Sequence, residues 1–219
     1  MNASSLESER ERVAAAARQL ASSGLVLGTA GNVSERAGEL VAVTPTGAVL
    51  ADLQAADVAV VDLDGAQVEG PLKPTSELDL HLGLYRRYEA GAVVHCHPPI
   101  GTALACVIDE LPVIHYQLLA LGGPVRVGRY ETFGSPALAQ ATLDALEGRV
   151  AALMSNHGAI AYGGDMTGAM ANAELLEWGC ELYWRAAAIG TPRALDEDAR
   201  AAVVDAVTSR SYGATHEAQ

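Results

Sequence analysis

Apolar residues recur three and four positions apart in several segments of the chain, a spacing that places them on one face of a helix. Capping residues mark some of the ends, since Gly24 follows the first segment and Ser135 precedes another. Pro98 and Pro99 predict the start of a shorter helix that includes 103–111. The pattern predicts the remaining helices over 5–23, 75–90, 112–123, 135–148, 165–189 and 194–210.

Between these helices lie short runs rich in β-branched and apolar residues, bounded by Gly, Pro, Asn and Asp, which is typical of strands. Single strands are expected in 92–97 and 124–134, and pairs of strands in 25–36 (loop at 28–32), 39–50 (turn at 44–47), 57–70 (turn at Asp64-Gly65) and 149–164 (break at 156–158). Tight turns between paired strands favour antiparallel pairing. We therefore expect an α/β fold, a single three-layer domain over 1–219 with a central, mostly antiparallel sheet flanked by helices on both faces.

Composition narrows the classes of partner. The formal net charge is −13, which disfavours nucleic acid and anionic membranes but is compatible with a small anionic substrate. No apolar run approaches the roughly 20 residues of a membrane span, and the first residues lack the apolar core of a signal peptide. The three cysteines have no paired spacing, as expected for free buried thiols in a reducing compartment, so we expect a cytoplasmic protein.

The run 92-AVVHCHPPIG-101 carries the clearest chemical signal, because His95 and His97 close an apolar strand. Residues i and i+2 of a strand point to the same face, so both imidazoles could bind one ion. The alternative is a pair of polar residues at a strand end that bind nothing.

Zinc needs three or four such ligands, so a third histidine is required. His216 lies in a polar tail, His115 on a helix, and His81 on a helix face that we expect to be exposed. That leaves His157, at the break between two strands, where Gly158 should let the backbone turn.

A second candidate site begins at 73-KPTSELDLH-81, the start of the helix expected over 75–90. Thr75 or Ser76 can cap this helix, with Gly91 at its other end, and Glu77 suits the helix dipole. The same features form an anion site, since hydroxyls and free N–H groups at a helix start hold phosphate. The Gly-rich turns in 28-GTAGNVSER-36 and 43-VTPTGA-48 could also approach a phosphate, although each alone is a common loop.

The motifs GTAGNVSER, VTPTG, KPTSE, VVHCHPP, IHY, YETFG and SNHGAIAYG occur in this order, and over roughly residues 8–190 the chain resembles the class II aldolase/adducin family. It is most similar to the family's zinc-dependent sugar-phosphate aldolases, of the fuculose-1-phosphate aldolase type. The resemblance implies one Zn²⁺ per subunit, held by His95, His97 and His157, with Glu77 able to complete the shell. It implies phosphate binding by Asn32, Thr46, Gly47, Thr75 and Ser76.

The implied activity is reversible cleavage of a ketose 1-phosphate, such as L-fuculose 1-phosphate, to dihydroxyacetone phosphate and an aldehyde. Zinc would act as the Lewis acid and Glu77 would return a proton to C3. Tyr116, or Tyr212 from a neighbouring subunit, would handle the proton on the C4 oxygen. The resemblance also implies a homotetramer with active sites between subunits.

Alternatives stay open at this point. A Schiff-base mechanism could use only Lys73, the single lysine. The same metal site could serve an epimerase, dehydratase or decarboxylase, although the related epimerases carry Asp where this chain has Glu77. A non-catalytic adducin-like module is a further alternative. The family's PYATFG motif reads 129-RYETFG-134 here, so Arg129 and Glu131 leave the identity of the aldehyde open.

Overall fold

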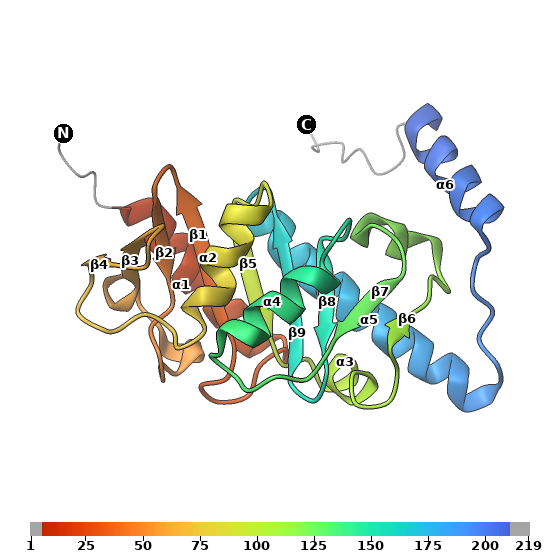
Figure 1. Ribbon diagram of the computed structural model, residues 1–219, viewed down its shortest axis with the longest axis horizontal. Coiled ribbons are helices and arrows are strands. Elements are labelled where there is room, and N and C mark those ends of the chain that lie inside the picture. Colours follow the sequence, from red (N-terminus) through yellow and green to blue (C-terminus); the bar gives the residue numbers. More distant parts are fainter. Residues whose placement is uncertain (1–5, 211–219) are drawn as a thin grey trace.

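A nine-stranded sheet runs through the computed structural model, which describes residues 6–210 (Figure 1). The strand order is β4-β3-β2-β1-β5-β9-β8-β7-β6, and all pairs are antiparallel except β7–β8. The expected fold class is confirmed: an α/β domain with helices on both faces of a mostly antiparallel sheet. Tyr212 and His216 lie outside the described residues.

The element bounds follow the sequence pattern closely. The strands are β1 (Asn32–Ala37), β2 (Leu40–Val43), β3 (Ala59–Asp62), β4 (Gln67–Glu69), β5 (Ala92–Cys96), β6 (Glu110–Leu111), β7 (Val125–Gly128), β8 (Ala151–Met154) and β9 (Gly158–Gly163). The α-helices are α1 (Glu7–Ser22), α2 (Leu78–Arg87), α3 (Pro99–Leu104), α4 (Pro136–Ala145), α5 (Met166–Ile189) and α6 (Glu197–Arg210). The short 3-10 helices are η1 (Leu50–Asp52), η2 (Ala55–Asp57) and η3 (Tyr116–Leu121).

Each face of the sheet has its own apolar core. Helices α1, α3 and α5 cover one face and α2 and α4 cover the other (Figure 1). The central strand β5 is buried along its whole length, with Val94 in the first core and Val93 in the second. A strand covered on both faces reads as a continuous apolar run, which explains the sequence AVVHC.

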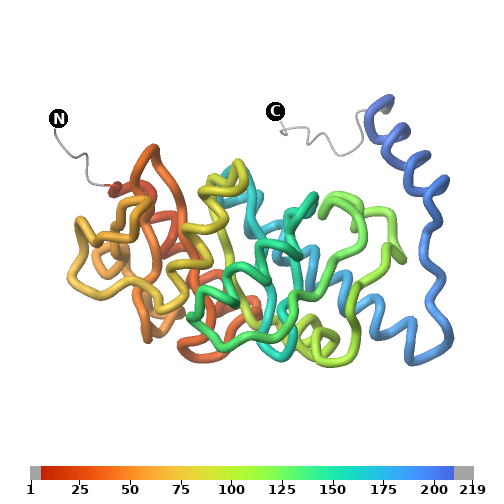
Figure 2. Tube along the Cα trace, in the orientation of Figure 1, coloured from red at the N-terminus to blue at the C-terminus, as the bar shows by residue number. Residues whose placement is uncertain are grey.

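Strand ends and loops from distant parts of the chain meet at one end of the central strands. Asn32, the first residue of β1, is paired with His95 near the end of β5. The loop 25–31, the segment 129–135 and the β8–β9 turn lie at the same end of the strands, at the bottom of the view (Figure 2). Most of the motifs singled out in the sequence therefore lie at this end of the strands.

Three local expectations were wrong. Residues 25–31 form a loop with no strand, and the strand expected to resume after the 44–47 turn is replaced by η1. The helix α3 ends at Leu104, and Glu110–Leu111 belongs to a strand. Some apolar side chains of these segments, such as Leu25, Leu50 and Ala105, pack into the core from loops or short helical turns, which periodicity alone does not distinguish from a regular element.

The caps of α2 also differ from expectation. Its N-cap position is Glu77, and the Thr75 hydroxyl accepts a hydrogen bond from the Glu77 N–H at 3.2 Å just before the helix begins. Its C-cap is Tyr88 in extended conformation. Gly91 instead lies directly against the backbone of Gly164, where a side chain would not fit.

Candidate active site

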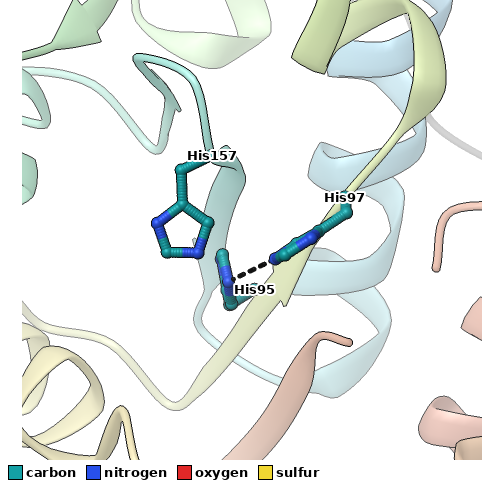
Figure 3. A group of neighbouring side chains, drawn as sticks. All are labelled: His95, His97 and His157. Carbon is teal, nitrogen blue, oxygen red and sulfur yellow. Dashed lines mark hydrogen bonds between the residues drawn. The ribbon is translucent and has the colours of Figure 1, made fainter. Parts of the chain in front are cut away.

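Three imidazoles meet where β5 ends and β8 turns into β9 (Figure 3). His95 lies on β5, His97 just beyond it, and His157 in the β8–β9 turn. Their ligand atoms all lie within 4.8 Å of one another, and the Nε2 atoms of His95 and His97 are 3.0 Å apart. The structure thus brings together the three histidines that the sequence singled out as metal ligands.

The orientation of His95 is set by a backbone hydrogen bond. Its ring is fully buried, and Nδ1 lies 2.9 Å from the Ala159 carbonyl oxygen on β9. Because a carbonyl only accepts, Nδ1 carries the hydrogen and Nε2 presents a lone pair toward the other two rings. Such a bond from the far ring nitrogen is the usual support for a metal-binding histidine.

Gly158 brings the β8–β9 turn close to His97, but not in the way the sequence suggested. The left-handed residue of the turn is Asn156, with φ of 53°. A Cβ on Gly158 would lie 2.5 Å from the Cys96 carbonyl oxygen and 2.9 Å from the His97 ring. The glycine is needed because the two strand ends approach closely, and not because its backbone turns.

Glu77 faces the histidines with an unused carboxylate oxygen. The residue is 8% exposed, and its Oε2 accepts a hydrogen bond from Asn32 Nδ2 at 2.9 Å. Oε2 also lies 3.2 Å from His95 Nε2, and Oε1 lies 3.4 Å from His157 Nε2. Within the described residues, Oε1 is buried without a hydrogen-bond partner.

An orphaned carboxylate oxygen and imidazole lone pairs aimed at one point are costly in a folded protein unless a cation joins them. The donor set, three imidazoles and one carboxylate, matches what zinc binds. The residues therefore fit the metal that the sequence implied.

The charges of the site favour metal binding at neutral pH. Burial lowers the pKa of His97 to about 4, aided by the neighbouring His95 and His157, and burial also lowers the pKa of His157. Burial alone would raise the pKa of Glu77, but the neighbouring His95 side chain and the hydrogen bond from Asn32 hold it well below its usual range. Glu77 is thus ionised while both imidazoles keep free lone pairs.

A pocket of about 170 Å³ opens beside the histidines. Its lining includes every residue expected to bind phosphate, together with Glu77 and two of the histidines: Asn32, Thr46, Gly47, Thr75, Ser76, Glu77, His97 and His157. No lysine or arginine of the described chain lines it, and Lys73 is exposed. An anion in this pocket would be held by neutral donors and by the metal centre.

The two loop motifs at the pocket are joined by backbone pairing. The Thr46 N–H donates to the Lys73 carbonyl at 3.0 Å, and Pro45 and Pro74 form an isolated β-bridge. Gly47 has φ of 71°, a conformation that favours glycine. These contacts place VTPTG beside KPTSE, although the two motifs lie far apart in the sequence.

Three residues that the sequence singled out lie away from the pocket. Tyr116 lines a separate groove of about 360 Å³ between η3, α5 and α6. Arg129 and Glu131 form an exposed ion pair with each other at 2.9 Å. Phe133, in the same YETFG motif, does line the pocket, and only the motif itself could have pointed to it.

His81 was assigned to an exposed helix face, and this was wrong. The ring is fully buried and is bonded to Ser34 and Asn32. The sequence did carry a signal, since His81 and Tyr85 are four residues apart on the apolar face of α2. The burial expected for Cys106 was also wrong, because this thiol is exposed. Cys96 and Cys180 are buried free thiols, as expected.

Comparison with known proteins gives a consistent picture. The family model for the class II aldolase and adducin N-terminal domain matches residues 11–184. A 5-deoxy-D-ribulose 1-phosphate aldolase of Bacillus thuringiensis serovar kurstaki is 41% identical over 88% of this chain and 92% of its own. A 5-methylthioribulose-1-phosphate/5-deoxyribulose-1-phosphate aldolase of Rhodospirillum rubrum is 41% identical over 90% and 89%.

A solved structure of an L-fuculose 1-phosphate aldolase superposes with a TM-score of 0.88 at 31% identity, covering 92% of this chain and 96% of that one. Among the described residues, no helix is long and apolar enough to cross a membrane.

Proposed function

The chain belongs to the class II aldolase and adducin family and is an aldolase, and from this premise we propose that it cleaves a ketose 1-phosphate to dihydroxyacetone phosphate and an aldehyde. One observation carries the proposal: three imidazoles and Glu77 share a single pocket with the loops expected to bind phosphate.

We propose zinc as the metal, held by His95, His97 and His157, with Glu77 as a fourth ligand that substrate can displace. A divalent cation bound there supplies Lewis-acid stabilisation of the charge that develops on the substrate carbonyl oxygen. The burial of these side chains limits water at the centre.

The loop residues would hold the phosphate and so fix the position of the carbon chain. Thr46, Gly47 and Ser76 are exposed at the pocket and can donate from hydroxyls and backbone N–H groups. Holding the C1 phosphate at this end orients the carbonyl toward the imidazoles, which lowers the entropic part of the barrier.

The reaction breaks the C3–C4 bond, removes the proton of the C4 hydroxyl and adds a proton to C3. Glu77 is the group we assign to C3, because its Oε1 has no hydrogen-bond partner and faces the pocket. The ionised carboxylate removes the C3 proton of dihydroxyacetone phosphate in the synthesis direction, and the same proton returns from Glu77 to C3 in cleavage. For the C4 hydroxyl we keep Tyr116 and Tyr212, acting from a neighbouring copy in a homotetramer, since Tyr116 does not line this pocket in its own chain.

Among ketose 1-phosphates we favour a 5-deoxypentulose 1-phosphate over L-fuculose 1-phosphate. Both relatives that are 41% identical carry names that specify 5-deoxyribulose 1-phosphate. Phe133 is 70% exposed and lines the pocket, so it offers apolar surface to a methyl or methylthio end.

The test is a cleavage assay on 5-deoxyribulose, 5-methylthioribulose and L-fuculose 1-phosphates with chelated and zinc-restored protein. We expect dihydroxyacetone phosphate plus acetaldehyde from the first substrate, no activity after chelation, and recovery with zinc. A product that keeps all its carbons would replace the aldolase proposal with an epimerase or a dehydratase. Activity that survives exhaustive chelation would reject the metal.

Replacement of Glu77 by Gln tests the proton role. We expect kcat to fall by about 10²–10⁴-fold, the usual contribution of a positioned acid or base, with a much smaller change in KM. Glu131→Gln is the matched control, because Glu131 pairs with Arg129 on an exposed loop. Near-normal turnover of Glu77→Gln would remove Glu77 from this role.

A further inference from the structure

We propose that His81 is a positioning residue for Glu77, acting through a buried chain of hydrogen bonds. This rests on the proposed function, in which Glu77 carries the proton for C3. The chain runs from Tyr85 OH to Ser34 Oγ (2.7 Å), to His81 Nδ1 (2.7 Å), from His81 Nε2 to Asn32 Oδ1 (2.5 Å), and from Asn32 Nδ2 to Glu77 Oε2 (2.9 Å).

Two elements build the chain. Asn32 and Ser34 are two residues apart on β1, so both point to the face of the sheet that α2 covers. His81 and Tyr85 lie one turn apart on α2 and face the strand. Helix and strand thus interleave their polar side chains within an apolar core, and Glu77 lies at the N-cap position of the same helix.

The direction of every hydrogen bond follows from the last one. Asn32 donates through Nδ2 to Glu77, so its Oδ1 must accept from His81. His81 therefore carries its hydrogen on Nε2, and its Nδ1 accepts from the Ser34 hydroxyl. Ser34 in turn accepts from the Tyr85 hydroxyl. All donors point toward the carboxylate, an arrangement in which successive bonds strengthen one another.

The consequence for Glu77 is an asymmetric carboxylate. Oε2 is fixed by the chain, whereas Oε1 has no hydrogen-bond partner and faces His157. Fixing one oxygen holds the other in place for metal or proton without occupying it. Burial keeps His81 neutral, which preserves the ring nitrogen that accepts from Ser34.

A purely structural role is the rival reading, since buried polar groups must be bonded in any case. A structural role predicts lost stability without a specific effect on kcat. A positioning role predicts that kcat falls while KM and the fold are retained, because only the carboxylate orientation changes.

The first experiment uses metal-free protein and needs no substrate. We expect ¹⁵N-histidine NMR at pH 7 to show a neutral ring with its hydrogen on Nε2 that is assigned to His81 because its resonances are lost in His81→Gln. Ser34→Ala should shift its Nδ1 resonance, because the accepted hydrogen bond is lost. A His81 ring that is charged, or that carries its hydrogen on Nδ1, would overturn the proposal.

The second experiment measures kcat and KM of Ser34→Ala and Tyr85→Phe with the zinc-loaded enzyme. Residues that support metal ligands typically contribute about 10–100-fold, so we expect kcat to fall by about 10-fold or more in Ser34→Ala, with KM nearly unchanged. Tyr88→Phe is the matched control, because Tyr88 donates to the Leu143 carbonyl outside the chain. His81→Gln, which can still donate to Asn32, should retain more activity than His81→Leu.

The two experiments separate the possible failures. If the wild-type protein cleaves no ketose 1-phosphate, the proposed function fails. A His81 ring that is charged, or that carries its hydrogen on Nδ1, would independently reject the proposed chain of hydrogen bonds. If the wild type is active and Ser34→Ala has normal kcat, the positioning role is rejected while the aldolase remains.

Discussion

Most of the buried polar side chains of the described residues lie around the Glu77 carboxylate. Their close neighbours are apolar, so each must find a partner within the protein. Those nearest Glu77 are Asn32, Ser34, Thr44, Thr75, His81 and His95. Single substitutions here should therefore change both stability and the geometry of the site.

Gly158→Ala tests the close approach of the two strand ends. The added Cβ would meet the Cys96 carbonyl oxygen at 2.5 Å, so backbone must move. We expect a loss of about 1–3 kcal/mol in the free energy of unfolding, typical of overpacking, together with weaker zinc binding in a chelator competition. Gly164→Ala is the control, since a Cβ there meets nothing within 4 Å. Equal effects of both substitutions would contradict the explanation.

The pH dependence of stability should report His81. Burial lowers its pKa to about 3 in the folded state, while the unfolded value is about 6.5. The unfolded state therefore binds one more proton between these values, and stability falls as the pH drops below 6.5. The slope is about 1.4 kcal/mol per pH unit for this one proton.

Urea unfolding of the metal-free protein between pH 7.5 and pH 5 measures that slope. We expect the free energy of unfolding of His81→Gln to fall less steeply over this range than that of the wild type. The difference in slope should be about 1.4 kcal/mol per pH unit below pH 6.5, the contribution of one proton. Parallel curves for the two proteins would show that His81 is not neutral in the folded state.

At the scale of elements, helix starts and strand ends supply the site. The helix α3 begins directly after His97, and its cap comes from another helix. The Glu177 carboxylate on α5 accepts from the backbone N–H groups of Ile100 at 2.9 Å and Gly101 at 2.7 Å. This bond ties the end of β5 to the longest helix.

Glu177→Gln should weaken that tie, because a carboxylate binds two N–H groups more strongly than an amide does. We expect the free energy of unfolding to fall by about 1–2 kcal/mol and the zinc affinity to fall as His97 loses support. Glu174→Gln, one turn earlier and exposed, serves as control in the same titration. A normal zinc affinity in Glu177→Gln would separate α3 from the metal site.

Much of the fold and of the site could be predicted from sequence, and the failures share a physical cause. Periodicity identified the long helices and the central strands, and His-x-His with SNHG identified three histidines that the structure brings together. It did not identify the burial of His81 or the role of Gly158, because both depend on which elements pack together. The position of Phe133 at the pocket likewise depends on a loop that crosses between layers.

At the scale of the whole molecule, the candidate metal site joins segments that lie far apart in the sequence. The ligands come from β5 and from the β8–β9 turn, and Glu77 comes from the start of α2. An unfolded chain cannot hold them together, so zinc should bind the folded state alone.

Thermal unfolding measures this coupling. With free zinc at 100 times its Kd, binding contributes about 2.7 kcal/mol, which corresponds to about 5–10 °C in Tm for a chain of this length. His157→Ala should lose most of this shift, whereas His115→Gln, outside the cluster, should keep it. A shift that persists in His157→Ala would place the zinc elsewhere.

The position of β9 has a consequence for biosynthesis. It is the last strand along the described residues 6–210, yet it pairs with β5 on one side and β8 on the other. Until the ribosome has added residues 158–163, the nascent polypeptide holds two half-sheets, each with an open apolar edge that can pair with other chains. Insertion of β9 joins the halves and aligns His157 with His95 in the same event.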